Sequence, residues 1–198
     1  MAGEIAGTAA QKAALRKQIL AARDAQNAAT RAAASAAITR ELLALDAWRN
    51  ARCVLVYLNF GSEFDTTALV ADAVAGGKQL CLPRVDQAAH ALAIHAINNL
   101  ATDIQPGVWG IREPRPACPL TDLASIDFVL VPGVAFTPRC ERLGYGGGFY
   151  DALIARFAQR PPLVAAAFDL QMCGQIPLDV RDHALDLIVT ESTAHCGC

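Results

Sequence analysis

The sequence predicts an α/β domain with a mainly parallel central sheet. Short apolar runs alternate with helical stretches along the 198-residue chain, which is typical of layered α/β domains. Runs such as residues 53–58 are continuously apolar, as expected for strands buried on both faces. A chain of this length with 54% hydrophobic residues can bury a large core without disulfide or metal support. Because no repeat or linker divides it, we expect residues 1–198 to form a single domain.

The first part of the chain, from Thr8 to Ala47, predicts two helices with a break near residues 27–30. Alanine dominates this stretch and has the highest helix propensity, and no proline interrupts it. Lys12 and Arg16 are four residues apart, so they share one face of the first helix. On this spacing alone, a solvated basic face is the simpler interpretation.

The remaining elements follow from apolar runs and from the residues that end them. Gly76 and Gly77 are expected to end the helix at residues 66–75. Pro83 is expected to stop the strand that starts at Gln79. Four prolines and two glycines make residues 106–119 a loop. The predicted strands are 53–58, 79–82, 91–97, 126–131, 163–168 and 187–190, and the predicted helices are 66–75 and 149–157.

Composition limits the classes of partner and compartment. The formal net charge is −2 and only 18% of residues are charged, which argues against a nucleic-acid-binding surface. The longest apolar runs are far shorter than the roughly 20 residues of a membrane span, and the N-terminal segment does not resemble a secretory signal. Seven scattered cysteines without a CxxC pair indicate reduced thiols of a cytoplasmic protein. We therefore expect small-molecule partners, no nucleic acid, no membrane, and a monomer or weak dimer.

The segment from Arg142 to Asp151 carries the clearest chemical signal. Its four glycines expose backbone N–H groups before a predicted helix, an arrangement suited to phosphate. Arg142 adds a two-pronged donor, and Asp151 could hold a magnesium ion that also binds substrate phosphates. Aromatic side chains between them offer flat apolar faces for a ring. The segment is neither a P-loop nor the GxGxxG fingerprint, and a plain glycine-rich turn is the alternative.

The sequence resembles the 5-formyltetrahydrofolate cyclo-ligase family, also called 5,10-methenyltetrahydrofolate synthetase, over about residues 12–191. The resemblance rests mainly on the RLGYGGGFYD segment at residues 142–151, preceded by VPGVAF at 131–136. Shorter matches occur in order along the chain. They are KAALR at 12–16, EFDT at 63–66, LPR at 82–84, WGIREP at 109–114, and Asp182, Asp186 and Thr190-Glu191 near the end.

This resemblance implies a three-layer α/β/α fold and an ATP-dependent ligase of folate and one-carbon metabolism. The implied reaction closes 5-formyltetrahydrofolate to 5,10-methenyltetrahydrofolate with ATP as co-substrate and Mg²⁺ as cofactor. Phosphorylation of the formyl oxygen would make it a leaving group, and N10 would then attack the carbon.

The resemblance also implies roles for individual residues. The catalytic residues would be Arg142, Lys12 and Tyr150. The ATP contacts would be Lys12, Ala13, Ala14, Leu15, Arg16, Arg142, Leu143, Gly144, Tyr145, Gly146, Gly147, Gly148, Phe149 and Tyr150. The folate contacts would be Leu58, Glu63, Tyr145, Gly146, Gly147, Gly148 and Phe149, and the metal ligands would be Asp151 and Asp182.

Several alternatives stay open at the level of sequence. Glu63 suits the donor N–H groups of a pterin but could instead cap a strand end, and Asp182 could be a turn former. Cys140, Phe149 and Ala152 replace a glycine, a tyrosine and an arginine that are usual in the family. The first and third of these departures motivate a second hypothesis, a non-catalytic folate- or nucleotide-binding regulator with the same pocket. A third is a sugar-phosphate or acyl-CoA enzyme on a related α/β layout.

Overall fold

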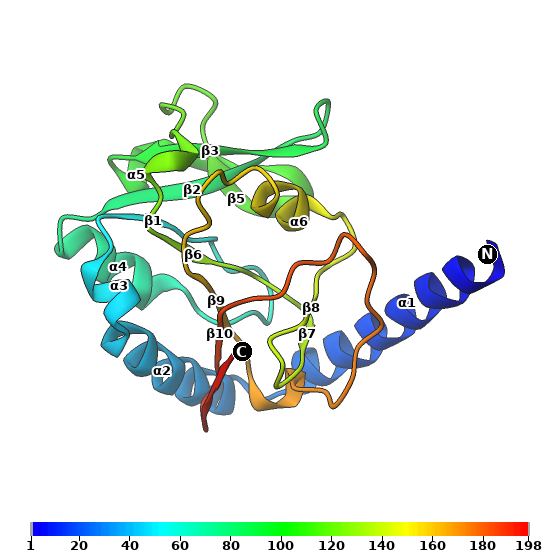
Figure 1. Cartoon of the computed structure of the whole chain (residues 1–198). Coiled ribbons are helices and arrows are strands. Elements are labelled where there is room, and N and C mark those ends of the chain that lie inside the picture. Colours follow the sequence, from blue (N-terminus) through cyan, green and yellow to red (C-terminus); the bar gives the residue numbers. More distant parts are fainter. Residues whose placement is uncertain (1, 198) are drawn as a thin grey trace.

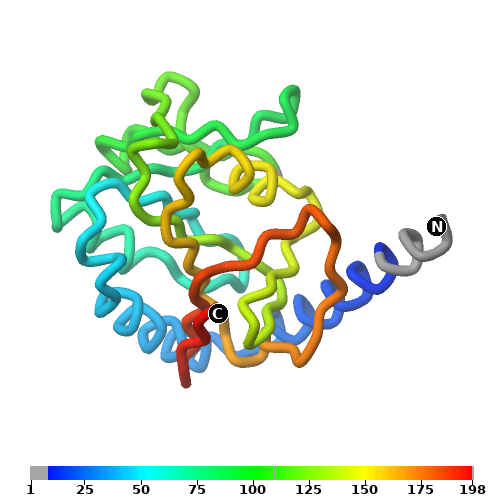
Figure 2. The backbone as a smooth tube through the Cα atoms, in the orientation of Figure 1, coloured from blue at the N-terminus to red at the C-terminus, as the bar shows by residue number. Residues whose placement is uncertain are grey.

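The structure is a computed structural model that describes residues 2–197, except for the side chains of residues 2–8 and Trp109; Cys198 lies outside the described residues. Figure 2 traces the path of the chain. The central sheet has seven strands in the order β11-β10-β9-β6-β1-β2-β3. The four inner pairs are parallel and the two outer pairs are antiparallel. The expected mainly parallel α/β sheet is therefore confirmed. Its strands are β1 (Cys53–Leu55), β2 (Gln79–Asp86), β3 (Ala91–Ile97), β6 (Phe128–Leu130), β9 (Leu163–Ala166), β10 (Leu187–Val189) and β11 (Ala194–Cys196).

Two short hairpins flank this sheet. One joins β4 (Ile104–Pro106) to β5 (Arg112–Pro114), and the other joins β7 (Ala135–Phe136) to β8 (Arg142–Leu143). The first overlaps residues 106–119, which the sequence predicted to be a loop, and begins two residues before them. Its prolines lie at the hairpin's ends, where a missing N–H is tolerated.

Helices cover both faces of the sheet, as Figure 1 shows. On one face, α2, α3 and α4 pack on a large apolar cluster, and α6 packs on a second cluster on the other face. Strand β9 shows why its sequence is continuously apolar. Leu163 and Ala165 belong to the cluster under α6, whereas Val164 and Ala166 belong to the cluster under α2–α4. The helices are α1 (Ala2–Ala25), α2 (Ala28–Ala44), α3 (Asp46–Asn50), α4 (Thr67–Ala75), α5 (Leu100–Asp103) and α6 (Phe149–Ile154), with 3-10 turns η1 (Val108–Gly110), η2 (Leu123–Ser125) and η3 (Asp169–Gln171).

The break between the first two helices lies where the sequence places it. The side chain of Asn27 accepts a hydrogen bond from the N–H of Thr30 at 2.9 Å and so caps the start of α2. The first helix reaches back to Ala2 and is longer than expected. It packs by its later turns on a third apolar cluster, which includes Ile19, Val134 and Ile176.

The prediction that Pro83 ends its strand is wrong. Strand β2 continues to Asp86, and Pro83 pairs with Ile94 of β3. The pairing of β2 with β1 stops at Cys81, so among the described residues the part of β2 that contains Pro83 pairs with β3 alone. A proline is tolerated there because its missing N–H faces the open side. Helix α6 also ends three residues earlier than predicted, at Ile154.

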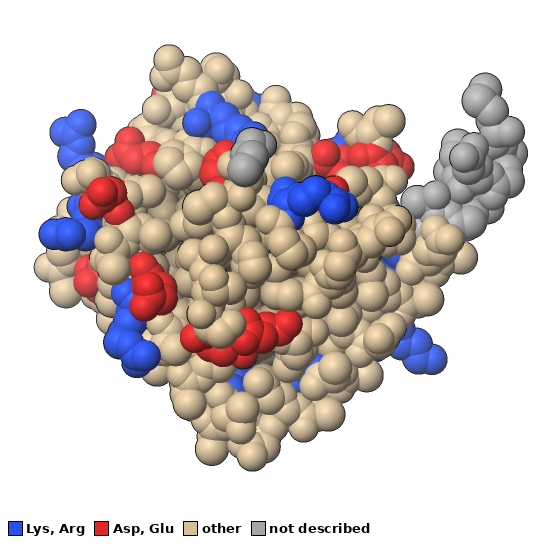
Figure 3. Space-filling model, turned by 60° about the horizontal axis from the view of Figure 1, so that its bottom comes forward, with Lys and Arg blue, Asp and Glu red and all other residues tan. Residues whose placement is uncertain are grey.

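Charged side chains are scattered over the surface. On the face shown in Figure 3, acidic and basic groups lie in small clusters among uncharged residues. None of the helices in the described part of the chain is both long and apolar enough to cross a bilayer.

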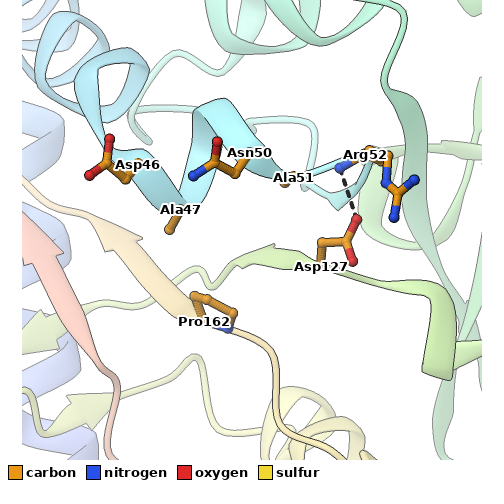
Figure 4. A pocket seen from close by; sticks show the side chains of 7 residues that line it. All are labelled: Asp46, Ala47, Asn50, Ala51, Arg52, Asp127 and Pro162. Atoms are coloured by element: carbon orange, nitrogen blue, oxygen red, sulfur yellow. Dashed lines mark hydrogen bonds between the residues drawn. The ribbon is translucent and has the colours of Figure 1, made fainter.

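A shallow hollow of about 310 Å³ lies at the amino ends of the parallel strands (Figure 4). Its walls include Arg52, Asp127 and Pro162, the residues that immediately precede β1, β6 and β9. The carboxylate of Asp127 accepts the N–H groups of Arg52 and Cys53 at 2.8 and 3.0 Å. These bonds tie the starts of two strands together, so this carboxylate has a structural role. In parallel sheets, ligands gather at the opposite edge.

Candidate functional site

The candidate site lies beyond the carboxyl ends of the central strands, where three distant segments meet. They are helix α1, the turn after β1 at residues 57–66, and the glycine-rich loop after β8 at residues 144–148. The Nε of Arg16 donates to the carbonyl oxygen of Gly144 at 2.7 Å, and the hydroxyl of Tyr145 donates to the carboxylate of Glu63. These three segments therefore meet at the carboxyl ends of the strands, where ligands gather in parallel sheets.

The glycine-rich loop takes a conformation that needs glycine at specific positions. Gly146 and Gly148 have φ angles of +109° and +69°, in the region that side chains rarely adopt. At Gly147, a Cβ would lie 2.6 Å from the ring of Phe149. The loop leads directly into α6, and Gly148 precedes the first helical residue.

Arg142 lies at the centre of this site and is only 5% exposed. Its Nη2 donates to Oδ1 of Asp151 at 2.7 Å, and its Nη1 donates to the carbonyl oxygen of Pro132 at 3.3 Å. The Nε is buried and has no hydrogen-bond partner among the described residues. A Cβ on Gly144 would lie 2.6 Å from Nη1, so glycine there leaves room for the guanidinium. Arg142 and Asp151, the first and last residues of the glycine-rich segment, therefore form a largely buried ion pair.

A second ion pair lies beside the first. Nζ of Lys12 is 2.6 Å from Oδ2 of Asp182, and the same oxygen accepts the N–H of Asp179 at 2.7 Å. The N–H of His183 lies 3.4 Å from Oδ1 of Asp151, which places the turn that carries Asp182 against the Arg142–Asp151 pair. Two cations and two carboxylates from four chain segments thus gather at this edge. One of these carboxylates belongs to Asp182. The residues alone did not distinguish Asp182 from a turn former.

Glu63 is held by contacts with its own turn and with the glycine-rich loop. Its Oε2 accepts the N–H of Phe60 at 2.8 Å, so it caps its own turn. Its Oε1 accepts from Tyr145 of the glycine-rich loop. The turn itself is held by Asn59, whose side-chain oxygen accepts from the N–H and the hydroxyl of Thr66 at 3.3 and 3.1 Å. The carboxylate of Glu63 is thereby held between its own turn and the glycine-rich loop.

Three tyrosines interact electrostatically with Glu63. Burial raises the pKa of Tyr57, Tyr145 and Tyr150, and the negative charge of Glu63 raises each pKa further. These phenols are therefore protonated at neutral pH and can donate hydrogen bonds. The hydroxyl of Tyr150 is buried without a hydrogen-bond partner among the described residues. A buried, unpaired polar group is costly unless a ligand can satisfy it.

Some residues that were expected to contact ATP or folate lie away from the polar groups of the site. Ala13 and Ala14 are exposed on α1, because they follow Lys12 by one and two positions and so turn away from its face. Leu15 and Leu143 pack in the apolar cluster beneath α1, and Leu58 lies in the main core. These apolar residues support the segments that carry the polar groups.

Cys140 shows how the chain tolerates a departure from the family pattern. Its φ is +61°, a left-handed conformation that glycine adopts more readily than residues with a side chain. The side chain is fully buried, and Sγ donates to the carbonyl oxygen of His195 at 3.1 Å. Ala152, the other motivating departure, is exposed on α6.

Sequence reasoning missed two residues at this site, Arg23 and His90. Arg23 lies seven residues after Arg16 on the same face of α1, so its helical spacing could have found it. His90, in the turn between β2 and β3, has no such signal. Its Nε2 lies 3.0 Å from the carbonyl oxygen of Gly147, and its ring lies on that of Phe149 with centroids 4.7 Å apart. Only tertiary structure brings this hairpin to the loop.

Replacing His90 with phenylalanine is expected to loosen the glycine-rich loop. Phenylalanine keeps a ring against Phe149 but removes the N–H that must donate to the carbonyl of Gly147. Losing one hydrogen bond of about 1 kcal/mol predicts roughly fivefold faster hydrogen exchange at Ala152, whose N–H donates to the carbonyl oxygen of Gly148 at 3.0 Å. His90→Gln, which keeps a donor, is the control and is expected to exchange more slowly than His90→Phe. Equal exchange in both variants would contradict a role for this hydrogen bond.

Comparison with known proteins places the chain in a family. A family model described as the 5-formyltetrahydrofolate cyclo-ligase family matches residues 8–191. The chain is 27% identical to 5-formyltetrahydrofolate cyclo-ligase of Mus musculus, over 79% of this chain and 81% of that protein. It is 28% identical to the enzyme of the same name from Escherichia coli K12, over 72% and 79% respectively. The NMR structure of Aquifex aeolicus 5,10-methenyltetrahydrofolate synthetase matches with a TM-score of 0.83 and 28% identity, over 94% of this chain and 92% of that one. Because the family model spans nearly the whole chain, this protein belongs to the 5-formyltetrahydrofolate cyclo-ligase family.

Proposed function

We propose that the protein is a cytoplasmic enzyme that converts 5-formyltetrahydrofolate and ATP to 5,10-methenyltetrahydrofolate, ADP and phosphate, with Mg²⁺ as cofactor. Family membership supports the ligase activity. The observation that carries the proposal is the meeting of α1, the Glu63 turn and the glycine-rich loop at one edge of the sheet. We assign the cationic groups at this edge to a polyphosphate and the fixed carboxylate of Glu63 to a pterin.

The proposed reaction solves a problem of leaving-group chemistry. The oxygen of a formamide is a poor leaving group, and its carbonyl carbon is a weak electrophile. Attack of the formyl oxygen on the γ-phosphorus of ATP forms a C–O–P linkage and releases ADP. N10 then attacks the activated carbon and loses its proton as the C–O bond breaks. Phosphate departs with the former formyl oxygen, leaving the five-membered iminium ring of the product. Catalysis then consists mainly of positioning and charge neutralisation.

The basic side chains suit the polyphosphate of ATP. We assign Lys12, Arg16 and Arg142 to neutralise negative charge on the transferring group, with the backbone of residues 144–148 alongside. Arg142 and Lys12 each hold a carboxylate at 2.7 and 2.6 Å, which fixes their positions before ATP binds. Tyr150 contributes a protonated hydroxyl with an unmet hydrogen-bonding capacity. Ala13 and Ala14, exposed on α1, contribute through the helix backbone that positions Lys12.

We assign the folate to the side of the site that holds Glu63. Glu63 presents carboxylate oxygens that accept from the N–H groups of a pterin, and Leu58 supports the turn from the core. Tyr145 and Phe149 provide aromatic faces beside it. The exposed ring of Phe60 lies in the same turn as Glu63.

The residues present fit a magnesium ion that arrives with ATP. Among the described residues, no group of three or more histidine, cysteine, aspartate or glutamate side chains could hold a metal. Mg²⁺, however, is usually bound by one or two carboxylates together with substrate phosphates, and Asp151 and Asp182 supply that number. The hydrogen bonds found for Asp151 use Oδ1, and those found for Asp182 use Oδ2, so each residue has a second oxygen for a cation. When bound, Mg²⁺ would neutralise charge on the phosphates.

An absorbance assay tests the proposed function. Purified protein is mixed with 5-formyltetrahydrofolate and Mg-ATP, and the rise in methenyl-folate absorbance is followed. We expect a rise that requires ATP. Tight folate binding without an ATP-dependent rise would reject the enzyme and support the non-catalytic regulator.

Asp151→Asn is expected to lower turnover by about tenfold to a hundredfold and to raise the Mg²⁺ concentration needed for half-maximal rate. Asparagine still accepts from Arg142 but lacks the charge that attracts the cation. The measurement is turnover against Mg²⁺ concentration at saturating ATP. Asp179→Asn, in the same turn as Asp182, is the matched control and is expected to leave this dependence unchanged. An unaltered Mg²⁺ dependence in Asp151→Asn would remove Asp151 from the metal site.

A further inference from the structure

Arg23 is a buried cation that lies outside the groups assigned above. It projects from α1 and is 4% exposed. No ion pair among the residues with described side chains involves it. Burying a charge in this way is costly unless other groups compensate it.

The bonds of Arg23 lead to the folate side of the site. Its Nε donates to Oγ of Ser62 at 3.0 Å, and its Nη1 donates to the hydroxyl oxygen of Tyr145 at 3.0 Å. The guanidinium carbon lies 5.8 Å from the centroid of the Tyr145 ring. The hydroxyl of Ser62 in turn donates to the carboxylate of Asp24. One side chain of α1 thereby holds both the Glu63 turn and the glycine-rich loop.

The direction of these hydrogen bonds is fixed by chemistry. Arginine has donors and no acceptor, so the oxygen of Tyr145 accepts from Arg23. The raised pKa of Tyr145 keeps its hydroxyl protonated, and that hydroxyl donates to Oε1 of Glu63. The other oxygen of Glu63 accepts the N–H of Phe60 at 2.8 Å. The carboxylate is therefore oriented from two sides, and one of them depends on Arg23.

We infer that Arg23 is a positioning residue for the reduced folate, acting through Tyr145 to orient the carboxylate of Glu63. This inference rests on the proposed role of Glu63 as the pterin ligand. Helix α1 carries Lys12 and Arg16 toward ATP and Arg23 toward the folate, so one rigid element positions groups for both substrates. Each carboxylate oxygen has two lone pairs, so Glu63 can accept from a pterin while it keeps its protein partners.

A double-mutant cycle tests the inference. The variants are Arg23→Met, Tyr145→Phe and the two combined, with KM for 5-formyltetrahydrofolate, KM for ATP and kcat measured for each. Each single change is expected to raise the folate KM about tenfold and to change the ATP KM and kcat less than twofold. The combined variant is expected to match the single variants, because all three break the same chain of bonds. Arg23→Lys keeps a donor and is expected to restore part of the folate affinity. Arg40→Met, on the exposed face of α2, is the control and is expected to behave as the wild type.

Additive effects in the combined variant, or equal increases in both KM values, would overturn the inference. A purely structural role would lower the unfolding temperature of Arg23→Met while the folate KM stayed unchanged, and that result would also overturn it. These outcomes differ from failure of the proposed function, which would show as no ATP-dependent turnover in the wild type.

Hydrogen exchange provides a readout that does not need turnover. The N–H of Phe60 is protected by Glu63, so its exchange reports whether the carboxylate is held. Arg23→Met and Tyr145→Phe are both expected to speed exchange at Phe60 about fivefold or more without ligand. Unchanged exchange at Phe60 in both variants would overturn the positioning role even in a protein without turnover.

Discussion

Replacing Arg142 with methionine is expected to reduce turnover at least a hundredfold and to lower the free energy of unfolding by about 3 kcal/mol. The guanidinium is almost fully buried and its Nη2 lies 2.7 Å from Asp151. Methionine fills similar space but leaves the carboxylate of Asp151 without its partner in a largely buried position. Chemical denaturation measures the stability loss, and steady-state kinetics at varied ATP measures the catalytic loss.

Two further variants separate the catalytic loss from the stability loss. Arg142→Met combined with Asp151→Leu removes both charges, so it is expected to regain much of the stability but none of the turnover. Arg142→Lys keeps a positive charge beside Asp151 but lacks the two-pronged donor, and it is expected to fold while losing most of its turnover. Arg142→Lys with more than half of the wild-type turnover would contradict the assignment of the guanidinium to phosphoryl transfer.

Replacing Glu63 with glutamine is expected to raise the KM for 5-formyltetrahydrofolate by about tenfold to a hundredfold. Hydrogen bonds to a charged group contribute about 1.5–3 kcal/mol, and glutamine keeps the shape of the side chain without its charge. One of the two positions that now accept, from Phe60 and Tyr145, would also become a donor. The KM for ATP is expected to stay within about twofold, because Lys12, Arg16 and Arg142 are unchanged.

Glu41→Gln is the matched control for this prediction, since Glu41 is exposed on α2. It is expected to leave both KM values at their wild-type levels. Folate binding by Glu63→Gln is also measured by equilibrium titration without ATP, so that affinity is observed apart from catalysis. Folate affinity equal to that of the wild type would remove Glu63 from the pterin site and leave it the capping role in its own turn.

The sequence predicted most of the fold because its signals are local. Continuous apolar runs such as residues 163–166 identify strands buried on both faces, and the structure places their alternate side chains in two separate clusters. The sequence also predicted a break between the first two helices near residues 27–30, where the structure shows the side chain of Asn27 capping the second helix. The prediction at Pro83 was wrong because a proline ends a strand only where a partner strand needs the N–H that proline lacks. Whether such a partner is present is a property of the sheet.

The candidate site, like the fold, was predicted only in part from the sequence. Residue types and spacing indicated Arg142 and Asp151 directly, and the family resemblance implied Lys12, Arg16, Glu63 and Asp182. The ion pairs Lys12–Asp182 and Arg142–Asp151, the contact of His90 with the glycine-rich loop and the chain from Arg23 through Tyr145 to Glu63 were decided only by tertiary structure. Contacts between residues as far apart as 23 and 145 leave no periodic trace in a sequence, since they depend on how helices and loops pack at the sheet edge. The sequence determined which charges are available, and packing determined which of them meet.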